Sequence, residues 1–402
     1  MLILDVVLVL AGGYLSGKLA TKLRLPALLG MLLYGIAIGP YGLGVLSEEF
    51  IQQAPTVSVV ALVTVIISSF FAIDLAVLRR NVRTVVLVGV VPGVLEGTAV
   101  ATAAVALLDF SWVQGGILGF TIAVVSPAVV VPTMIRLKEA GWGADKSVPV
   151  LVLAATNLDG LVAVILWLVF VTIETGGGDI AEVSTVAIGE ILWGALVGLV
   201  VGRVAAWLAD RWLENASTWL RTLLLLVASL AVFFSSEVLP VNGPITLLAF
   251  GLTLANTTTL DLRPVGKSVS QLWSVAAVFL FVLIGSIADL DTVGDVGLVG
   301  LVVIAVGVLA RLAGVMVVLV GSPLNRSERL FVGIGTTGKA TVQATLAPLV
   351  VALGITNGET ILAIAVLAIL TMSVLASVGI ELTYRRLLSP PEISATERAS
   401  PM

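Results

Sequence analysis

Apolar stretches of about 18 to 27 residues recur along the whole chain, and short segments rich in charged residues separate them. A helix rises 1.5 Å per residue, so roughly 20 apolar residues cross a hydrocarbon core about 30 Å thick. The pattern predicts thirteen membrane-spanning helices. Their expected ranges are 2–17, 26–43, 55–78, 84–108, 113–136, 148–173, 184–208, 218–238, 241–257, 268–288, 296–321, 328–353 and 359–383.

These spans leave no room for a water-soluble domain. The sequence therefore predicts one all-α polytopic membrane domain over residues 1–388 and a short cytoplasmic tail over 389–402, which is expected to be disordered. The first apolar stretch begins at Leu2 and shows neither a basic segment nor a small-residue cleavage site. We interpret it as a span and not as a signal peptide.

Composition narrows the possible chemistry. Of the 402 residues, 59% are hydrophobic and only 11% are charged, which favours lipid as the solvent for most of the chain. Cysteine and histidine are absent, which excludes disulfides, thiolate chemistry and imidazole ligands. Any proton that the protein transports must then bind to a carboxylate or a lysine side chain. No enzyme constellation, metal cluster or nucleic-acid motif is visible in the sequence, so we expect no enzymatic role, no cofactor and no nucleic-acid partner.

The basic residues fix an orientation. With the N-terminus outside, 19 of the 21 Lys and Arg residues fall on the inner side, and the other two, Arg311 and Lys339, lie within predicted spans. Because cytoplasmic loops are enriched in Lys and Arg, the sequence predicts an external N-terminus and a cytoplasmic C-terminus, with the protein in the plasma membrane. The outer loops carry acidic residues, among them Glu48, Glu49, Glu174, Asp179, Asp289, Asp291, Asp295 and Glu359.

Four ionisable residues stand out at membrane depth within the predicted spans: Glu96, Asp159, Arg311 and Lys339. A charge at membrane depth costs at least about 2.5–3.5 kcal/mol on insertion, so such residues are functional candidates by default. Two alternatives stay open at this point. Glu96 and Arg311 can form a structural ion pair between helices, and Lys339 can either neutralise helix ends or take part in transport directly.

Asp159 is the strongest candidate for an ion site. Thr156 and Asn157 precede it in the sixth predicted span, and no basic residue lies nearby in the sequence. A carboxylate with a neighbouring hydroxyl and amide is a suitable ligand set for a hard cation or a proton. The sequence therefore predicts an ion and proton site at Asp159, Asn157 and Thr156.

Two predicted spans contain helix-breaking residues at mid-depth. The fifth holds Ser126, Pro127, Pro132 and Thr133, and the twelfth holds Gly333, Gly335, Thr336, Thr337 and Gly338 directly before Lys339. Proline removes a backbone donor and glycine loosens a helix. Interrupted helices at membrane depth are tolerated where they line a cavity, and secondary transporters use them at their binding sites. We expect both spans to be broken there.

At these residues the chain resembles the sodium/proton antiporters of the cation/proton antiporter superfamily. It is similar to the branch that includes the animal mitochondrial-type sodium/hydrogen exchanger-like proteins and their bacterial relatives. The residues that carry the resemblance are 116–120, 126–132 and 148–149, with Pro92, Glu96, Gly143, Lys146, Ala154, Ala155, Asp159, Lys267, Trp273, Phe281, Arg311 and 339–344.

The resemblance implies an inverted-repeat fold in which the fifth and twelfth spans are broken and cross near the middle of the membrane, with the ion site on the sixth. It implies a monovalent cation and a proton as substrates and a homodimer as the assembly. By position, Asp159 matches the first of two adjacent aspartates of that family. Arg311 matches its basic residue on the eleventh span, Glu96 the acidic partner of that residue, and Lys339 the lysine after the twelfth-span break.

One position departs from the family. Where the second aspartate of the pair is expected, this chain has Gly160. The main hypothesis is a secondary antiporter that exchanges Na⁺ or Li⁺, with K⁺ as a further candidate, for protons by alternating access, with Asp159 as carrier. The alternative is a protein that keeps the antiporter fold but has lost or altered transport, as a sensor, a scaffold or a transporter of another solute.

Overall fold

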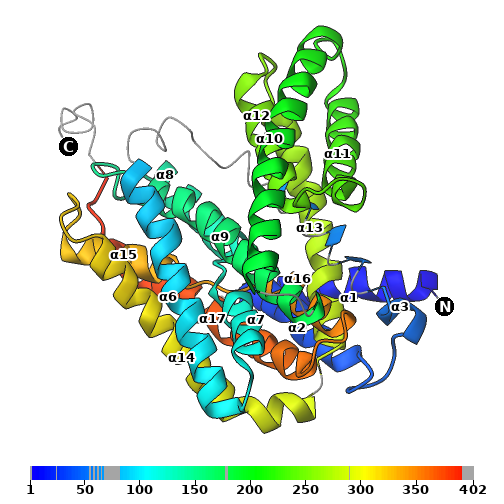
Figure 1. Cartoon of the computed structure of the whole chain (residues 1–402), viewed down its shortest axis with the longest axis vertical. Coiled ribbons are helices and arrows are strands. Elements are labelled where there is room, and N and C mark those ends of the chain that lie inside the picture. The colour runs from blue at the N-terminus through cyan, green and yellow to red at the C-terminus, as the bar shows by residue number, and fades with distance from the viewer. Residues whose placement is uncertain are drawn as a thin grey trace, which may run out of the picture.

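The computed structural model describes residues 2–391 except 24, 54–55, 58, 61–62, 65, 68–81, 177–179 and 289. Within these residues the chain forms helices and no strands (Figure 1). The helices are α1 (Leu2–Lys22), α2 (Ala27–Ile38), α3 (Glu48–Ile51), α6 (Val82–Leu108), α7 (Trp112–Ala123), α8 (Pro127–Glu139), α9 (Val148–Gly176), α10 (Ile180–Trp212), α11 (Thr218–Phe234), η1 (Ser235–Glu237), α12 (Gly243–Thr257), α13 (Arg263–Ser286), α14 (Leu290–Val318), α15 (Arg326–Gly335), α16 (Thr341–Ala352) and α17 (Gly358–Leu387).

Twelve of the thirteen expected spans overlap with these helices, and the remaining one, 55–78, lies largely outside the described residues. The tail from residue 392 onward lies outside them too. Eight described helices are long and apolar enough to cross a membrane. They are Ile3–Lys22, Val82–Leu108, Val148–Gly176, Gly189–Trp212, Thr218–Glu237, Arg263–Ser286, Asp291–Val318 and Gly358–Leu387.

The segments 113–136 and 328–353 each form two helices with a non-helical stretch between them. Helix α7 ends at Ala123 and α8 begins at Pro127, which takes the first helical position, where a missing N–H disrupts no hydrogen bond. Helix α15 ends at Gly335 and α16 begins at Thr341. Residues 124–126 and 336–340 therefore leave backbone amides and carbonyls available inside the helix bundle.

One set of helices is packed around α6. A Cβ added to Gly119 of α7 would lie 3.1 Å from the carbonyl carbon of Gly97 in α6, and one added to Gly314 of α14 would lie 3.0 Å from the Cα of Pro92. Such contacts require glycine, because backbones approach this closely only without a side chain between them. Gly89 of α6 approaches the backbone of α9 in the same way, whereas the glycines of α15 lie against side chains of their neighbours. We call α6–α9 and α14–α17 the core group.

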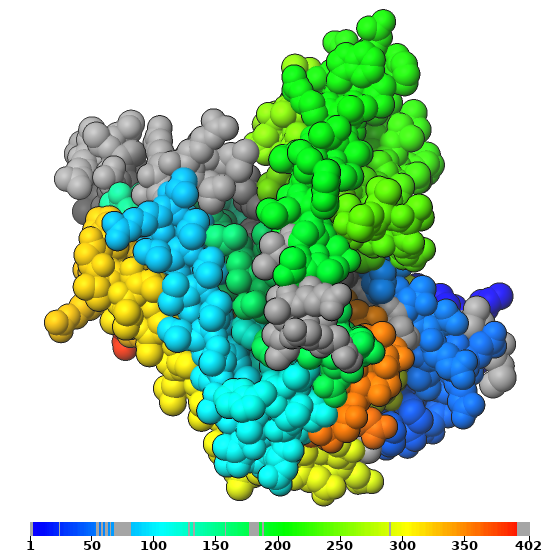
Figure 2. All heavy atoms as spheres, in the orientation of Figure 1, coloured from blue at the N-terminus to red at the C-terminus, as the bar shows by residue number. Residues whose placement is uncertain are grey.

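A second set contains α1, α2 and α10–α13, which we call the flanking group. A Cβ on Gly35 of α2 would lie 2.9 Å from the Cα of Val282 in α13, and one on Gly202 of α10 would lie 3.1 Å from the Cα of Phe250 in α12. Helices α10, α11 and α12 rise beyond the rest of the protein in Figures 1 and 2. This group is also held together by glycines, at different helix pairs.

The two groups meet through apolar side chains. Leu32 and Phe281 of the flanking group share a buried cluster with Leu346 and Ile364 of the core group. In the described part of the chain, no glycine brings the backbone of a core-group helix into contact with the backbone of a flanking-group helix. Part of the boundary is a cavity of about 360 Å³, whose lining includes Pro40, Tyr41, Ile287, Pro348 and Leu362.

Candidate functional site

The two helix interruptions bind each other. The Ser126 amide donates to the carbonyl of Gly338 at 2.8 Å, and the Thr341 amide donates to Ser126 Oγ at 3.0 Å. The hydroxyls of Ser126 and Thr341 are 2.9 Å apart. Polar groups released by one interruption are therefore satisfied by the other, which keeps both stable inside an apolar bundle.

Gln343 strengthens this contact and was not among the site residues predicted from the sequence. Its amide Nε2 lies 3.1, 3.3 and 2.7 Å from the carbonyls of Thr121, Ile122 and Val124, where α7 ends. Its Oε1 accepts the Ala340 amide at 2.8 Å. The signal in the sequence was an amide side chain in the middle of a predicted span, four residues after Lys339; the structure shows that it is fully buried.

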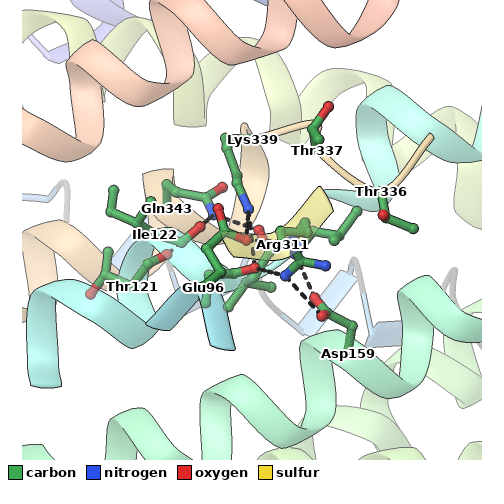
Figure 3. A network of polar contacts seen from close by, with 12 residues as sticks. Glu96, Thr121, Ile122, Asp159, Arg311, Thr336, Thr337, Lys339 and Gln343 are labelled. Atoms are coloured by element: carbon green, nitrogen blue, oxygen red, sulfur yellow. Dashed lines mark hydrogen bonds and ion pairs between the residues drawn. The ribbon is translucent and has the colours of Figure 1, made fainter. Parts of the chain in front are cut away.

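Four charged side chains converge beside the crossing (Figure 3). Arg311 of α14 donates from Nε to Glu96 of α6 and from Nη2 to Asp159 Oδ1 of α9, the latter at 2.9 Å. Lys339 donates to Glu96 Oε2 at 2.9 Å. Both cations also donate to the carbonyl of Ala123 at the end of α7, Lys339 at 3.1 Å. The structure thus brings together all four of the intramembrane charges that the sequence singled out.

These groups are almost completely removed from solvent: Glu96, Arg311 and Lys339 are 0% exposed and Asp159 is 2% exposed. Two carboxylates face two cations, so the ionised network carries no net charge. Mutual attraction and hydrogen bonds must offset a desolvation penalty of several kcal/mol per ion. Glu96 and Arg311 form an ion pair, which is one of the alternatives that the sequence left open, and the pair extends to Asp159 and Lys339.

Both oxygens of Asp159 are engaged. Oδ1 accepts from Arg311, and Oδ2 accepts from the amide of Val125 in the first interruption at 2.9 Å. The next residue is Gly160, and among the described residues a Cβ added there would meet only Val124, at 3.6 Å. Asp159 is therefore connected at once to α14 and to the break between α7 and α8.

The polar neighbours predicted for Asp159 differ in their placement. Thr156 lies one turn before it on α9 and is 0% exposed, and its hydroxyl has no hydrogen-bond partner among the described residues. Arg311 Nη1 and Glu96 Oε1 are also buried without a partner in that part of the chain. Asn157 lies in α9, but its side chain lies outside the described residues.

The residues predicted to line the breaks take different roles. Ser126 connects the two interruptions, whereas the hydroxyls of Thr336 and Thr337 donate to carbonyls of their own helix α15, Thr337 to Ile334 at 2.9 Å. They close the end of α15. Pro127 begins α8, Pro132 lies within the bounds of α8, and Thr133 is half-buried one residue further on.

An all-helical bundle with two interrupted helices crossing beside buried ion pairs is the architecture of a membrane ion transporter. The profile of the family described as "Sodium/hydrogen exchanger, transmembrane" matches residues 6–386, and the chain belongs to this family. It is therefore a multi-pass membrane protein in a family of transporters that carry out sodium/proton antiport.

Similar proteins and a similar solved structure agree with this family assignment. The chain is 29% identical over 401 residues to sodium/hydrogen exchanger 9B2 of Homo sapiens, covering 95% of this chain and 73% of that protein. It is 26% identical over 351 residues to human sodium/hydrogen exchanger 9B1, covering 83% and 67%. The structure of the sodium proton antiporter MjNhaP1 from Methanocaldococcus jannaschii matches with a TM-score of 0.80 at 20% identity, over 96% of this chain and 99% of that one. That last likeness establishes the fold.

Proposed function

We propose that this protein is a secondary active antiporter that exchanges a monovalent cation, Na⁺ or Li⁺ with K⁺ as a further candidate, for protons across the plasma membrane. Asp159 is the residue that carries cation and proton in turn. The observation that carries the proposal is the position of its carboxylate, which accepts from Val125 in a helix interruption and from Arg311 across the bundle.

The contacts of Asp159 suggest how exchange works. In this proposal the cation displaces Arg311 from Asp159 Oδ1, and Arg311 keeps its contacts with Glu96 and Ala123. Thr156 and Asn157 on the same helix, with backbone groups of the interruptions, complete the shell of the cation. A single carboxylate that exchanges one proton for one monovalent ion makes transport electroneutral, provided that neither Lys339 nor Arg311 gives up its own proton.

The two glycine-packed groups support alternating access. Backbones that lie in direct contact cannot slide past each other easily, whereas an apolar side-chain boundary with a cavity can rearrange. We propose that the core group moves as a body against the flanking group and exposes Asp159 to each side in turn. Residues 1–388 then form one exchanger domain of thirteen spans, with the fifth and twelfth broken.

The remaining parts of the proposal concern placement in the cell. The distribution of Lys and Arg supports an external N-terminus and a cytoplasmic C-terminus, with 389–402 as a short cytoplasmic tail. The resemblance to dimeric antiporters supports a homodimer. Chemical labelling of single introduced cysteines from each side of the membrane tests the orientation directly, since the natural chain has no cysteine.

The central experiment is cation-driven proton flux in proteoliposomes, with Na⁺, Li⁺ and K⁺ compared across pH. We expect Asp159→Asn to abolish flux, because the amide can neither carry a proton nor balance a cation. Asp5→Asn is the matched control: Asp5 is also buried, at 3% exposed, but its carboxylate binds Ser47 near the chain start at 2.6 Å. Flux that survives in Asp159→Asn would rule out Asp159 as the obligatory carrier.

A second candidate is a protein that retains the fold without this exchange. It is favoured by one observation: each oxygen of the Asp159 carboxylate already accepts a hydrogen bond, and the adjacent position, Gly160, offers no second carboxylate. Gly160→Asp tests it, and there is room for the Cβ of this substitution. A silent parent chain combined with a Gly160→Asp variant that gains cation-dependent flux would establish this candidate and dismiss the antiporter proposal.

A further inference from the structure

Gly93 of α6 forms one wall of the space that holds the Asp159 carboxylate. A Cβ at this position would overlap Asp159 Oδ1, and it would lie 3.3 Å from Asp159 Cγ and 3.4 Å from Arg311 Nη2. The carboxylate and the guanidinium thus meet directly against the backbone of α6. Only a residue without a side chain allows both to be there at once.

The carboxylate cannot move away freely. Its other oxygen is held by the Val125 amide at 2.9 Å, and Arg311 is held in turn by Glu96 and the Ala123 carbonyl. A side chain at position 93 must therefore be accommodated by lengthening the contact between Asp159 Oδ1 and Arg311 Nη2. Overpacking of this kind is relieved at the contact nearest to the added atom.

We propose that Gly93 is a positioning residue that sets how strongly Arg311 competes with the transported cation for the Asp159 carboxylate. This inference rests on the proposed role of Asp159 as carrier. The cation and Arg311 bind the same oxygen, so a tighter ion pair lowers the apparent affinity for the cation by the same free energy. The missing side chain at position 93 makes the pair tight.

If Gly93 served only to pack α6 against α9, its substitution would act like that of any other glycine at this contact. Gly89 provides that comparison. Gly89 lies one turn earlier on α6 and faces the same helix: a Cβ there would lie 2.8 Å from Leu158 Cβ and 3.0 Å from the Ala155 carbonyl. Gly89→Ala therefore disturbs the packing of α6 on α9 next to Asp159 without touching the carboxylate.

The experiment compares Gly93→Ala and Gly89→Ala in the full chain. The first measurement is the KM and the maximal rate of Na⁺-driven proton flux at several pH values. The second is the Na⁺ concentration that gives half of the maximal increase in Tm in detergent. For Gly93→Ala we expect the KM for Na⁺ to fall about tenfold, which corresponds to weakening the competing ion pair by roughly 1.4 kcal/mol. Half-maximal thermal stabilisation shifts to lower Na⁺ by the same factor, because a ligand stabilises the state it binds. Gly89→Ala lowers Tm and leaves both Na⁺ dependences unchanged.

A wild-type KM in Gly93→Ala, or an equal shift in Gly89→Ala, would overturn the inference. If Gly93→Ala does not fold, the test moves to Arg311→Lys, which keeps the charge but loses the forked contact. That substitution must lower the KM for Na⁺ by itself; a wild-type KM in Arg311→Lys would overturn the inference.

Asp159→Asn, measured in parallel, separates the two proposals. Flux that persists in Asp159→Asn defeats the proposed function. Flux that is abolished there, together with a wild-type KM in Gly93→Ala, defeats only the role of Gly93.

Discussion

The core group and the flanking group use the same packing device for different ends. In both, glycines bring helix backbones into contact, at Gly119 and Gly314 in the core group and at Gly35 and Gly202 in the flanking group. Only the core group also buries cations: within the described residues, Arg311 and Lys339 are the fully buried basic side chains, and both lie there.

The difference shows what close packing is for in each part. In the flanking group the glycines bring apolar helices together. In the core group they bring charged side chains into mutual contact, where ion pairs can offset the desolvation penalty. Since apolar residues of similar volume often replace buried ion pairs without loss of stability, the network is better explained by function than by stability.

The largest expected effect comes from breaking the network at its centre. Arg311→Met leaves Asp159 without a cationic partner and should lower the free energy of unfolding by about 3–5 kcal/mol, as removal of one member of a buried ion pair does. Thermal unfolding in detergent, with Arg311→Lys as the variant that retains the charge, measures this. A Met variant as stable as the wild type would mean that the network does not differ energetically from the apolar contacts of the flanking group.

A smaller effect is expected at the contact between the interruptions. Gln343→Leu leaves the carbonyls at the end of α7 and the Ala340 amide without their partner and should cost about 1–3 kcal/mol of stability. It should also reduce the maximal transport rate, because the crossing loosens. Gln343→Glu, which keeps an acceptor for Ala340, is the comparison variant. Equal behaviour of Leu and wild type in both assays would exclude a role for this amide.

The smallest functional effect is expected in the flanking group. Gly35→Ala forces a Cβ against the backbone of Val282 and should destabilise the protein by about 1–3 kcal/mol through overpacking. The KM for Na⁺ should stay at the wild-type value, since no charged group of the site touches this contact. A changed KM would show that the two groups are coupled more tightly than their apolar boundary suggests.

The sequence alone predicted the helices well, because a hydrophobic run of span length leaves little choice within a membrane. Ranges such as 84–108 and 148–173 correspond closely to α6 and α9. It also indicated that helices end near Pro127 and before Lys339, although Pro132 and Gly333 lie within α8 and α15, because proline and glycine weaken a helix without always ending it. The free-energy cost of placing a charge at membrane depth was enough to select four residues, Glu96, Asp159, Arg311 and Lys339, because such charges need partners.

The identity of the partners could not be read from the sequence, because pairing depends on where distant helices meet. The contact of Arg311 with Asp159 joins positions on α14 and α9, and that of Lys339 with Glu96 joins a break to α6. Gln343 and Gly93 were not predicted as site residues for the same reason: an amide in a predicted span and a glycine after Pro92 do not show which distant groups they contact.

The sequence by itself thus determined the solvent, the helices, their interruptions and the four charges that lipid would not tolerate unpaired. Each of these follows from a local property, the free energy of moving a residue or a segment from water into hydrocarbon. The tertiary structure decided which charges pair, that Asp159 is bound on both oxygens, and that Gly93 lies against its carboxylate. Those facts depend on distances between helices far apart in the chain, which only the packed bundle fixes.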